Sequence, residues 1–312
     1  MKRGRKVRFD PGLPKGLQDF LLLLAACVIR FFIWLTARLP EDRMKSLVRV
    51  LYRPCSWFNR RVCRRNLAAV FESFDRNPAQ LDQFLQRYLA YMVRFQVETA
   101  RCFSIPSADL EKKVLLQGEN HLREALKKGG GILLVSGHMG TWWHLPIWLA
   151  SRGHKVNVVF NSFPPPIEHY LEQNARLHGI SLAFVDRSVP AMMRQASRQN
   201  EIVFLTFDIS VRRHHPNWLP FGRTKININP GPAILARRHH IPAHFVSISH
   251  GDARRSHAII HPEASAGSND QPARSNDLCR AWVDQLYSDI LIFPEQWWGW
   301  GFSDLPYVRR HS

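Results

Sequence analysis

The chain has 312 residues, of which 45% are hydrophobic, so it can bury one large core or two small ones. Lysine and arginine number 43 against 25 acidic residues, and the formal charge of +18 indicates an anionic partner: nucleic acid, an acidic lipid surface or a phosphorylated substrate. The five cysteines are scattered without Cys-x-x-Cys spacing, which argues against a disulfide framework and a zinc site. We therefore expect a reducing compartment, no bound metal and no cofactor.

A basic tail precedes a hydrophobic run at the start of the sequence. The run FLLLLAACVIRFFIWLT, residues 20–36, would reach roughly 25 Å as a helix, just short of a bilayer core of about 30 Å. Arg38, Leu39 and Pro40 follow it instead of a small-residue cleavage site, so we expect 1–39 to form a retained membrane anchor. Basic residues flank both ends, which favours an anchor partly in the interface or a short span. A buried core helix is the alternative.

The next segment is predicted to be helical. From Leu47 to Ala100 apolar residues recur every three or four positions, and Asn77-Pro78 separates two helices. We assign 40–105 as the helical leading part of a domain that covers 40–312.

After Ala100 the pattern changes to short apolar runs separated by amphipathic segments. The expected strands are 114–118, 131–136, 155–160, 181–186, 201–208, 243–249 and 256–262. Residues 264–277 are expected to form a surface loop before a final helix. Strands that alternate with helices predict an α/β fold with a central, largely parallel sheet flanked by helices. Its ligand crevice should lie at the carboxyl ends of the strands.

His138 directly follows the apolar run 132–135, in the Ser-Gly-His turn of ILLVSGHMGTWWHL. This position lies in the expected crevice. Histidine suits a general base because its ordinary pKa of about 6.5 lies near working pH. The alternative is a structural histidine that is held by hydrogen bonds.

Four segments of the chain resemble a known family in the same order along the sequence. They are RRNLAAVF (64–71), GENHLREALKKGGGILLVSGHMGTWW (118–143), FDISVRRHHPNWLPFGRTKININPGPAILARR (207–238) and FPEQWWGWGF (293–302). From about Pro40 onward the chain resembles the lipid A late acyltransferases, the lauroyl and myristoyl transferases of Gram-negative bacteria, within the lysophospholipid acyltransferase-like proteins.

The resemblance implies a glycerol-phosphate acyltransferase-like fold and a transferase of lipid biosynthesis. Members move a fatty acyl chain from acyl carrier protein, or sometimes acyl-CoA, to a hydroxyl of a glycolipid at the cytoplasmic face of the cell inner membrane. The implied partners are the acyl donor, a lipid or glycolipid acceptor and the membrane. Nucleic acid is not expected, because the sequence shows no helix-turn-helix and no aromatic-basic platform.

One departure from the family concerns the acid of its His-x4-Asp/Glu dyad. His138 matches the histidine, but Trp143 occupies the position of the acid. Such a carboxylate fixes the imidazole tautomer and stabilises the imidazolium. If the enzyme is active, another group must orient His138. The candidates are Asp208, which matches a family acid at another strand end, Glu98 in the preceding helical region, or a backbone carbonyl. For Asp208 a turn or helix-cap role is the alternative.

Further residues are assigned to the substrate side of the site. Asn161 occupies a position where the family often has an arginine that would stabilise the thioester oxyanion, and Asn161 can donate only an uncharged hydrogen bond. Gly140 and Trp142 belong to the same histidine motif. In the Pro-Phe-Gly-Arg stretch, Arg223 could pair with a phosphate of an anionic headgroup.

Two further segments have alternative readings. Arg212 and Arg213 could extend the basic rim around Arg223, whereas a solvated basic loop is the alternative for each of these residues. The segment 297–300 is expected to pack in the core, and contact with lipid at the membrane interface is the alternative.

Two functions stay open at this point. The first is a membrane-associated acyltransferase in which His138 deprotonates the acceptor. The second is a catalytically degenerate relative that binds lipid or joins a complex, and the missing acid at position 143 is its main support.

Overall fold

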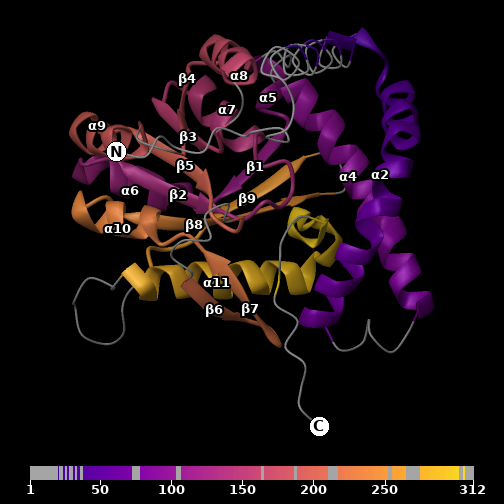
Figure 1. Cartoon of the computed structure of the whole chain (residues 1–312). Helices are drawn as coiled ribbons and strands as arrows, with labels where there is room; N and C mark the ends of the chain where they lie inside the picture. Colours follow the sequence, from indigo (N-terminus) through magenta and orange to yellow (C-terminus); the bar gives the residue numbers. More distant parts are fainter. Residues whose placement is uncertain are drawn as a thin grey trace.

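A seven-stranded sheet with helices on both faces organises the chain (Figure 1). The computed structural model describes residues 38–71, 78–102, 107–162, 165–185, 188–209, 217–251, 255–264, 275–301 and 305, with isolated positions between 20 and 35. The strand order is β1-β9-β8-β2-β5-β3-β4. The strands are β1 Val114–Gln117, β2 Ile132–Ser136, β3 Val156–Phe160, β4 Ile180–Phe184, β5 Ile202–Thr206, β8 Ala243–His250 and β9 Ser256–Ile260.

Five neighbouring strands run parallel, and only the pair β8–β9 is antiparallel within this sheet. Every residue of the central strand β2 is buried. A strand that is covered on both faces has a nearly continuous run of apolar residues, so the segment ILLVS could be predicted to be a strand from the sequence. The predicted α/β fold with a largely parallel sheet is confirmed.

The helices that follow the strands cover the two faces of the sheet. Figure 1 shows α7 and α8 on one side of the sheet, and α10 and α11 on the other. The helices are α5 Ser107–Leu110, α6 Glu119–Lys128, α7 His144–Ser151, α8 Pro165–Leu177, α9 Ser188–Gln199, α10 Gly231–Arg238 and α11 Ser275–Ile292. The helix α9 packs against α10.

Two long helices lead into the sheet, as the apolar spacing predicts. They are α2 Glu41–Val70 and α4 Pro78–Cys102, which pack against each other. Two short 3-10 helices near the end of the chain pack against them: η1 Pro294–Gln296 contacts α4, and η2 Trp298–Gly301 contacts α2. The Asn66 side chain donates a hydrogen bond to the carbonyl of Trp300, and Tyr88 donates one to the carbonyl of Trp298. The leading helices therefore hold the 294–301 segment in place.

A hairpin and a helix were not predicted. The strands β6 Asn217–Phe221 and β7 Thr224–Ile228 form a separate antiparallel pair. Their buried and exposed residues alternate, so neither strand shows a continuous apolar run. The helix α9 was not predicted from the sequence because its segment, SVPAMMRQASRQ, is largely polar and buries only Met193 and Ala196.

The expected anchor falls mostly outside the described residues. Of 20–36, the structure describes only positions 20, 24, 27, 31, 34 and 35. Among the helices of the described part, none is long and apolar enough to cross a membrane. The anchor over 1–39 therefore stays a prediction.

Candidate active site

Two adjacent parallel strands bring His138 and Asp208 together. Ser136, the last residue of β2, pairs with Thr206, the last residue of β5. His138 and Asp208 each lie two residues further along, so the register of the two strands places them side by side. This is the carboxyl edge of the sheet, where open α/β folds carry their reactive groups.

The carboxylate of Asp208 is fully enclosed and holds His138 at two points. Nδ1 of His138 lies 2.6 Å from Oδ1 of Asp208, and the backbone N–H of His138 donates to both carboxylate oxygens, at 3.1 and 3.0 Å. The indole Nε1 of Trp297 donates to Oδ2 over 2.7 Å. Every donor around the carboxylate therefore favours its charged form.

The electrostatics of this group follow from these contacts. Burial on its own would raise the pKa of Asp208, but the charge of His138 and the hydrogen bonds from His138 and Trp297 outweigh burial and lower that pKa. An ionised carboxylate only accepts hydrogen bonds, so Nδ1 of His138 carries the proton and Nε2 is left as the basic nitrogen.

Nε2 of His138 faces the hydroxyl of Thr206. Its Oγ1 lies 3.0 Å from Nε2 of His138, and Thr206 is half-buried at the end of β5. A hydroxyl can donate to Nε2 from this side, which is the geometry that a general base needs toward an acceptor hydroxyl. Thr206 was not singled out from the sequence, because a threonine at a strand end is common.

Two tryptophans flank the imidazole. The ring centroid of Trp298 lies 5.1 Å from that of His138, and the ring of Trp142 stands edge-on at 6.0 Å. The backbone N–H of Trp298 donates to the carbonyl of His138 over 2.9 Å, and Trp297 forms a bridge with Met139. The segment 297–300, which was read mainly as core, thus also covers and holds the histidine turn.

Two glycines allow this turn to pack closely. A Cβ on Gly137 would lie 2.4 Å from Cδ1 of Leu286 on α11, so a side chain there would require the buried Leu286 side chain to shift. Gly140 has a φ of +55°, and a Cβ there would meet Ile248 at 3.0 Å. Its carbonyl accepts a hydrogen bond from the hydroxyl of Tyr91 over 3.3 Å. Gly140 therefore shapes the backbone of the site.

Trp143, at the position of the family acid, lies in the core. It is 2% exposed and its ring stacks on Trp142, with centroids 4.5 Å apart. The ring centroid of Phe160 lies 5.2 Å from that of Trp143, and Trp142 in turn stacks on Phe204. Tryptophan here extends an aromatic cluster, while the carboxylate near His138 comes from β5.

Glu98, the other carboxylate considered for His138, lies in a neighbouring buried network. It accepts hydrogen bonds from Thr141 Oγ1 at 2.6 Å and from Arg94 Nε at 2.9 Å, and it lies 3.5 Å from Nδ1 of His250. Burial would raise the pKa of Glu98, but the charges of His250 and Arg94 outweigh it and lower that pKa. Glu98 therefore supports the turn through Thr141, three residues beyond His138.

Two buried histidines belong to the same network. His250 contacts Thr141 through Nε2 at 3.1 Å, and Nδ1 of His144 lies 2.8 Å from the hydroxyl of Ser256. Burial lowers the pKa of His144 to about 4 and that of His250 to about 4. Both imidazoles are therefore neutral near pH 7.

The remaining predicted residues lie at different distances from this centre. Asn161 directly follows β3, which neighbours β5, so it is at the same edge of the sheet and is half-buried. Arg223 is exposed in the turn between β6 and β7. That hairpin reaches the site through Phe221, whose ring lies 5.3 Å from that of Trp297. Arg212 and Arg213 lie outside the described residues.

In the described part of the chain, no group of three or more His, Cys, Asp and Glu residues is placed to hold a metal ion.

A histidine held through Nδ1 by a buried carboxylate, at the carboxyl edge of a parallel sheet, is typical of enzymes that activate a hydroxyl. The family of bacterial lipid A biosynthesis acyltransferases matches residues 15–300, and the chain belongs to this family. The resemblance seen in the sequence is confirmed, and membership of this family supports an acyltransferase of lipid A type. Comparison with the curated proteins finds no match.

Proposed function

We propose that the protein moves a fatty acyl chain from an acyl thioester to a hydroxyl or amine of a lipid or glycolipid. The donor is acyl carrier protein or acyl-CoA, and a lipid A-type saccharolipid is the first acceptor to test. The observation that carries the proposal is the 2.6 Å contact between Nδ1 of His138 and Asp208. It leaves Nε2 as a base at the edge of the sheet.

In this mechanism the acceptor attacks the donor directly. Nε2 of His138 takes the proton of the acceptor hydroxyl while its oxygen attacks the thioester carbonyl carbon. A C–O bond forms, and collapse of the tetrahedral intermediate breaks the C–S bond. The leaving thiolate receives the proton from the imidazolium, which Asp208 stabilises during the reaction. No serine or cysteine nucleophile is required.

One donor beside His138 and a second at the same edge of the sheet suit the developing oxyanion. Trp142 is buried edge-on to His138, and its indole N–H has no hydrogen-bond partner among the described residues. A buried donor without a partner is costly, so a substrate oxygen that accepts from it would be favoured. Asn161 at the end of β3 is a second donor. Uncharged donors can stabilise an oxyanion when they are fixed in place.

Exposed apolar residues and the positive charge support a location at the cytoplasmic face of the cell inner membrane of a Gram-negative bacterium. Phe20, Leu24, Phe31 and Trp34 are each at least about half exposed, and Phe31 stacks on Trp34. Their spacing fits one side of a helix, which would enter the lipid interface. The formal charge of +18 would attract anionic lipids and an acidic carrier protein. Arg223 is a candidate for a headgroup phosphate.

The alternative of a catalytically degenerate relative was based on Trp143 at the acid position. Asp208 offers a carboxylate to the same histidine from another strand, which supports the enzyme. The two functions differ in one measurement. Purified protein is incubated with acyl carrier protein or CoA thioesters and with saccharolipid, lysolipid and amino-lipid acceptors, and transfer of labelled acyl chain is followed. Acyl transfer by the wild type that is abolished in His138→Ala supports the proposal. Lipid binding without acyl transfer for every combination of donor and acceptor would contradict it.

A further inference from the structure

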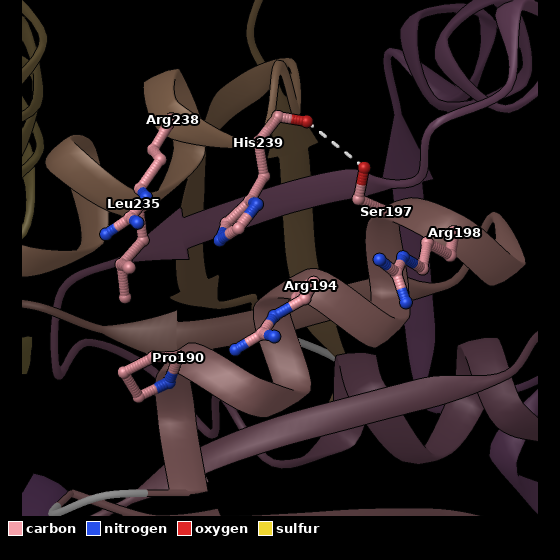
Figure 2. Close-up of a pocket in the computed structure, with 7 residues that line it drawn as sticks. All are labelled: Pro190, Arg194, Ser197, Arg198, Leu235, Arg238 and His239. Carbon is pink, nitrogen blue, oxygen red and sulfur yellow. Dashed lines mark hydrogen bonds between the residues drawn. The ribbon is translucent and has the colours of Figure 1, made fainter.

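A basic hollow of about 430 Å³ lies between α9 and α10 (Figure 2). Arg194 and Arg198 come from α9, whereas Arg238 and the following His239 come from the end of α10. In Figure 2 the side chains of Arg194 and His239 extend into the space between the two helices. Ser197 donates a hydrogen bond to the carbonyl of His239 over 3.1 Å, which ties the walls together.

Among the described residues, no acidic side chain neutralises the positive charge of this hollow. Within the part of the chain that the structure describes, the lining contains no aspartate or glutamate, and Arg194, Arg198 and Arg238 make no hydrogen bond or ion pair. Partial desolvation, followed by the charges of Arg238, Arg194 and Arg198, lowers the pKa of His239. The arginine charges disfavour a proton on His239 because they make the electrostatic potential in the hollow positive. The same potential would attract a bound anion.

The hollow is remote from His138. Arg198 lies just before β5, and His239 lies just before β8, so both are at the amino ends of these parallel strands. His138 and Asp208 lie beyond the carboxyl ends of β2 and β5. Figure 1 shows α9 and α10 at one end of the molecule and the leading helices α2 and α4 at the other. The hollow is therefore also on the far side from α2, which directly follows the expected anchor in the sequence, and from α4, which packs against α2.

We propose that the hollow between α9 and α10 binds a soluble organic phosphate with two or more phosphate groups. Guanidinium groups match phosphate oxygens with paired hydrogen bonds, and three of them from two helices can surround one diphosphate. The volume exceeds that of a single phosphate, and Pro190 and Leu235 offer apolar contact to the organic part of the ligand. A position away from α2 and α4 favours a soluble ligand over a lipid headgroup. This site is separate from acyl transfer and does not depend on it.

The test is direct binding to the full chain in neutral detergent at about 0.15 M ionic strength. Inorganic pyrophosphate and coenzyme A are titrated calorimetrically into the wild type, the double variant Arg194→Ala/Arg198→Ala, and Arg237→Ala. Arg237 is the matched control, because it is an exposed arginine of α10 that does not line the hollow. Alanine maintains both helices, and thermal unfolding verifies that each variant is folded.

We expect saturable one-to-one binding of at least one probe, weakened about tenfold or more in the double variant and by less than about twofold in Arg237→Ala. Absence of saturable binding to the wild type would overturn the proposal. Equal weakening in the double variant and in Arg237→Ala would overturn it too, since that result indicates general surface charge. Binding to vesicles of phosphatidylglycerol and phosphatidylcholine tests whether the ligand is a lipid headgroup. If the wild type binds the vesicles but neither pyrophosphate nor coenzyme A, and the double variant loses vesicle binding, the ligand is not a soluble phosphate.

Discussion

Trp297 and His138 bind the two oxygens of one buried carboxylate: Nε1 of Trp297 donates to Oδ2 of Asp208, and Nδ1 of His138 contacts Oδ1. The imidazole of His138 is thus oriented by a carboxylate that is itself oriented by a residue 89 positions later in the chain. Each partner of this arrangement can be altered separately.

The first prediction concerns the carboxylate. Asp208→Asn retains the size of the side chain but lets an amide N–H face Nδ1, which favours the wrong imidazole tautomer and removes the charge that stabilises the imidazolium. We expect kcat to fall by about a thousandfold or more, with the fold retained. Steady-state acyl transfer and circular dichroism measure the two effects. Asp284→Asn, which alters an exposed carboxylate on α11, is the control and should retain activity. Comparable activity in both variants would show that Asp208 does not assist His138.

The second prediction concerns the indole of Trp297. Trp297→Phe removes one hydrogen bond from the Asp208 carboxylate, which raises the proton affinity of the His138–Asp208 pair. The acid limb of the kcat profile should therefore move to higher pH by about one unit, and kcat should fall about tenfold. A pH–rate profile of the variant measures the shift. Trp300→Phe is the matched control, because Trp300 is also a fully buried indole but donates to the carbonyl of Pro294. An acid limb that moves equally in both variants would assign the effect to packing alone.

The third prediction concerns the position of the family acid. Because Trp143 is buried in an aromatic stack, Trp143→Glu would lose that packing and bury an unpaired carboxylate. We expect the free energy of unfolding to fall by about 3 kcal/mol or more, with no gain in activity, whereas Trp143→Phe should cost about 1–2 kcal/mol. Chemical denaturation measures both variants. Trp218→Glu, at a tryptophan that is 42% exposed, should be tolerated. A stable Trp143→Glu protein with increased turnover would instead mean that the site accepts an acid at position 143, immediately before α7.

The fourth prediction concerns pH and stability. His144 and His250 have pKa values lowered to about 4 by burial, whereas an unfolded histidine titrates near 6.5. The unfolded chain therefore binds more protons than the folded one between these values, so stability is present above pH 6.5 and is lost as pH falls toward 4. Each histidine should account for roughly 1 kcal/mol of lost stability between pH 7.5 and 5.5.

Denaturation at several pH values measures this loss. His250→Gln should flatten the pH dependence, while His169→Gln, which replaces an exposed histidine on α8, should leave it unchanged. A His250→Gln protein with the slope of the wild type would exclude His250 as the origin.

Much of the fold could be predicted because central parallel strands leave a clear pattern. The apolar run of β2 and the helical spacing of α4 are both properties of consecutive residues. The alternating β6–β7 hairpin and the largely polar α9 lack such a pattern, since their burial depends on what packs against them.

Individual residues of the site could be predicted from the sequence, but the contacts between them could not. His138 and Asp208 both follow apolar strands, so both could be named, yet Glu98 was also a candidate. The choice depends on β5 lying next to β2 with Ser136 opposite Thr206, which is a property of the sheet. The contact of Trp297 with Asp208 joins distant segments and carries no local pattern.

The dependence of Asp208 on residues near position 297 also bears on how the enzyme matures during synthesis. A nascent chain that has emerged only as far as α11 contains β2, β5 and both members of the histidine–aspartate pair, yet it lacks the indole donor and the backbone N–H that hold the histidine turn. Acyl transfer would then begin only after translation has passed these tryptophans, so a prematurely terminated product would have the sheet without a competent catalytic centre.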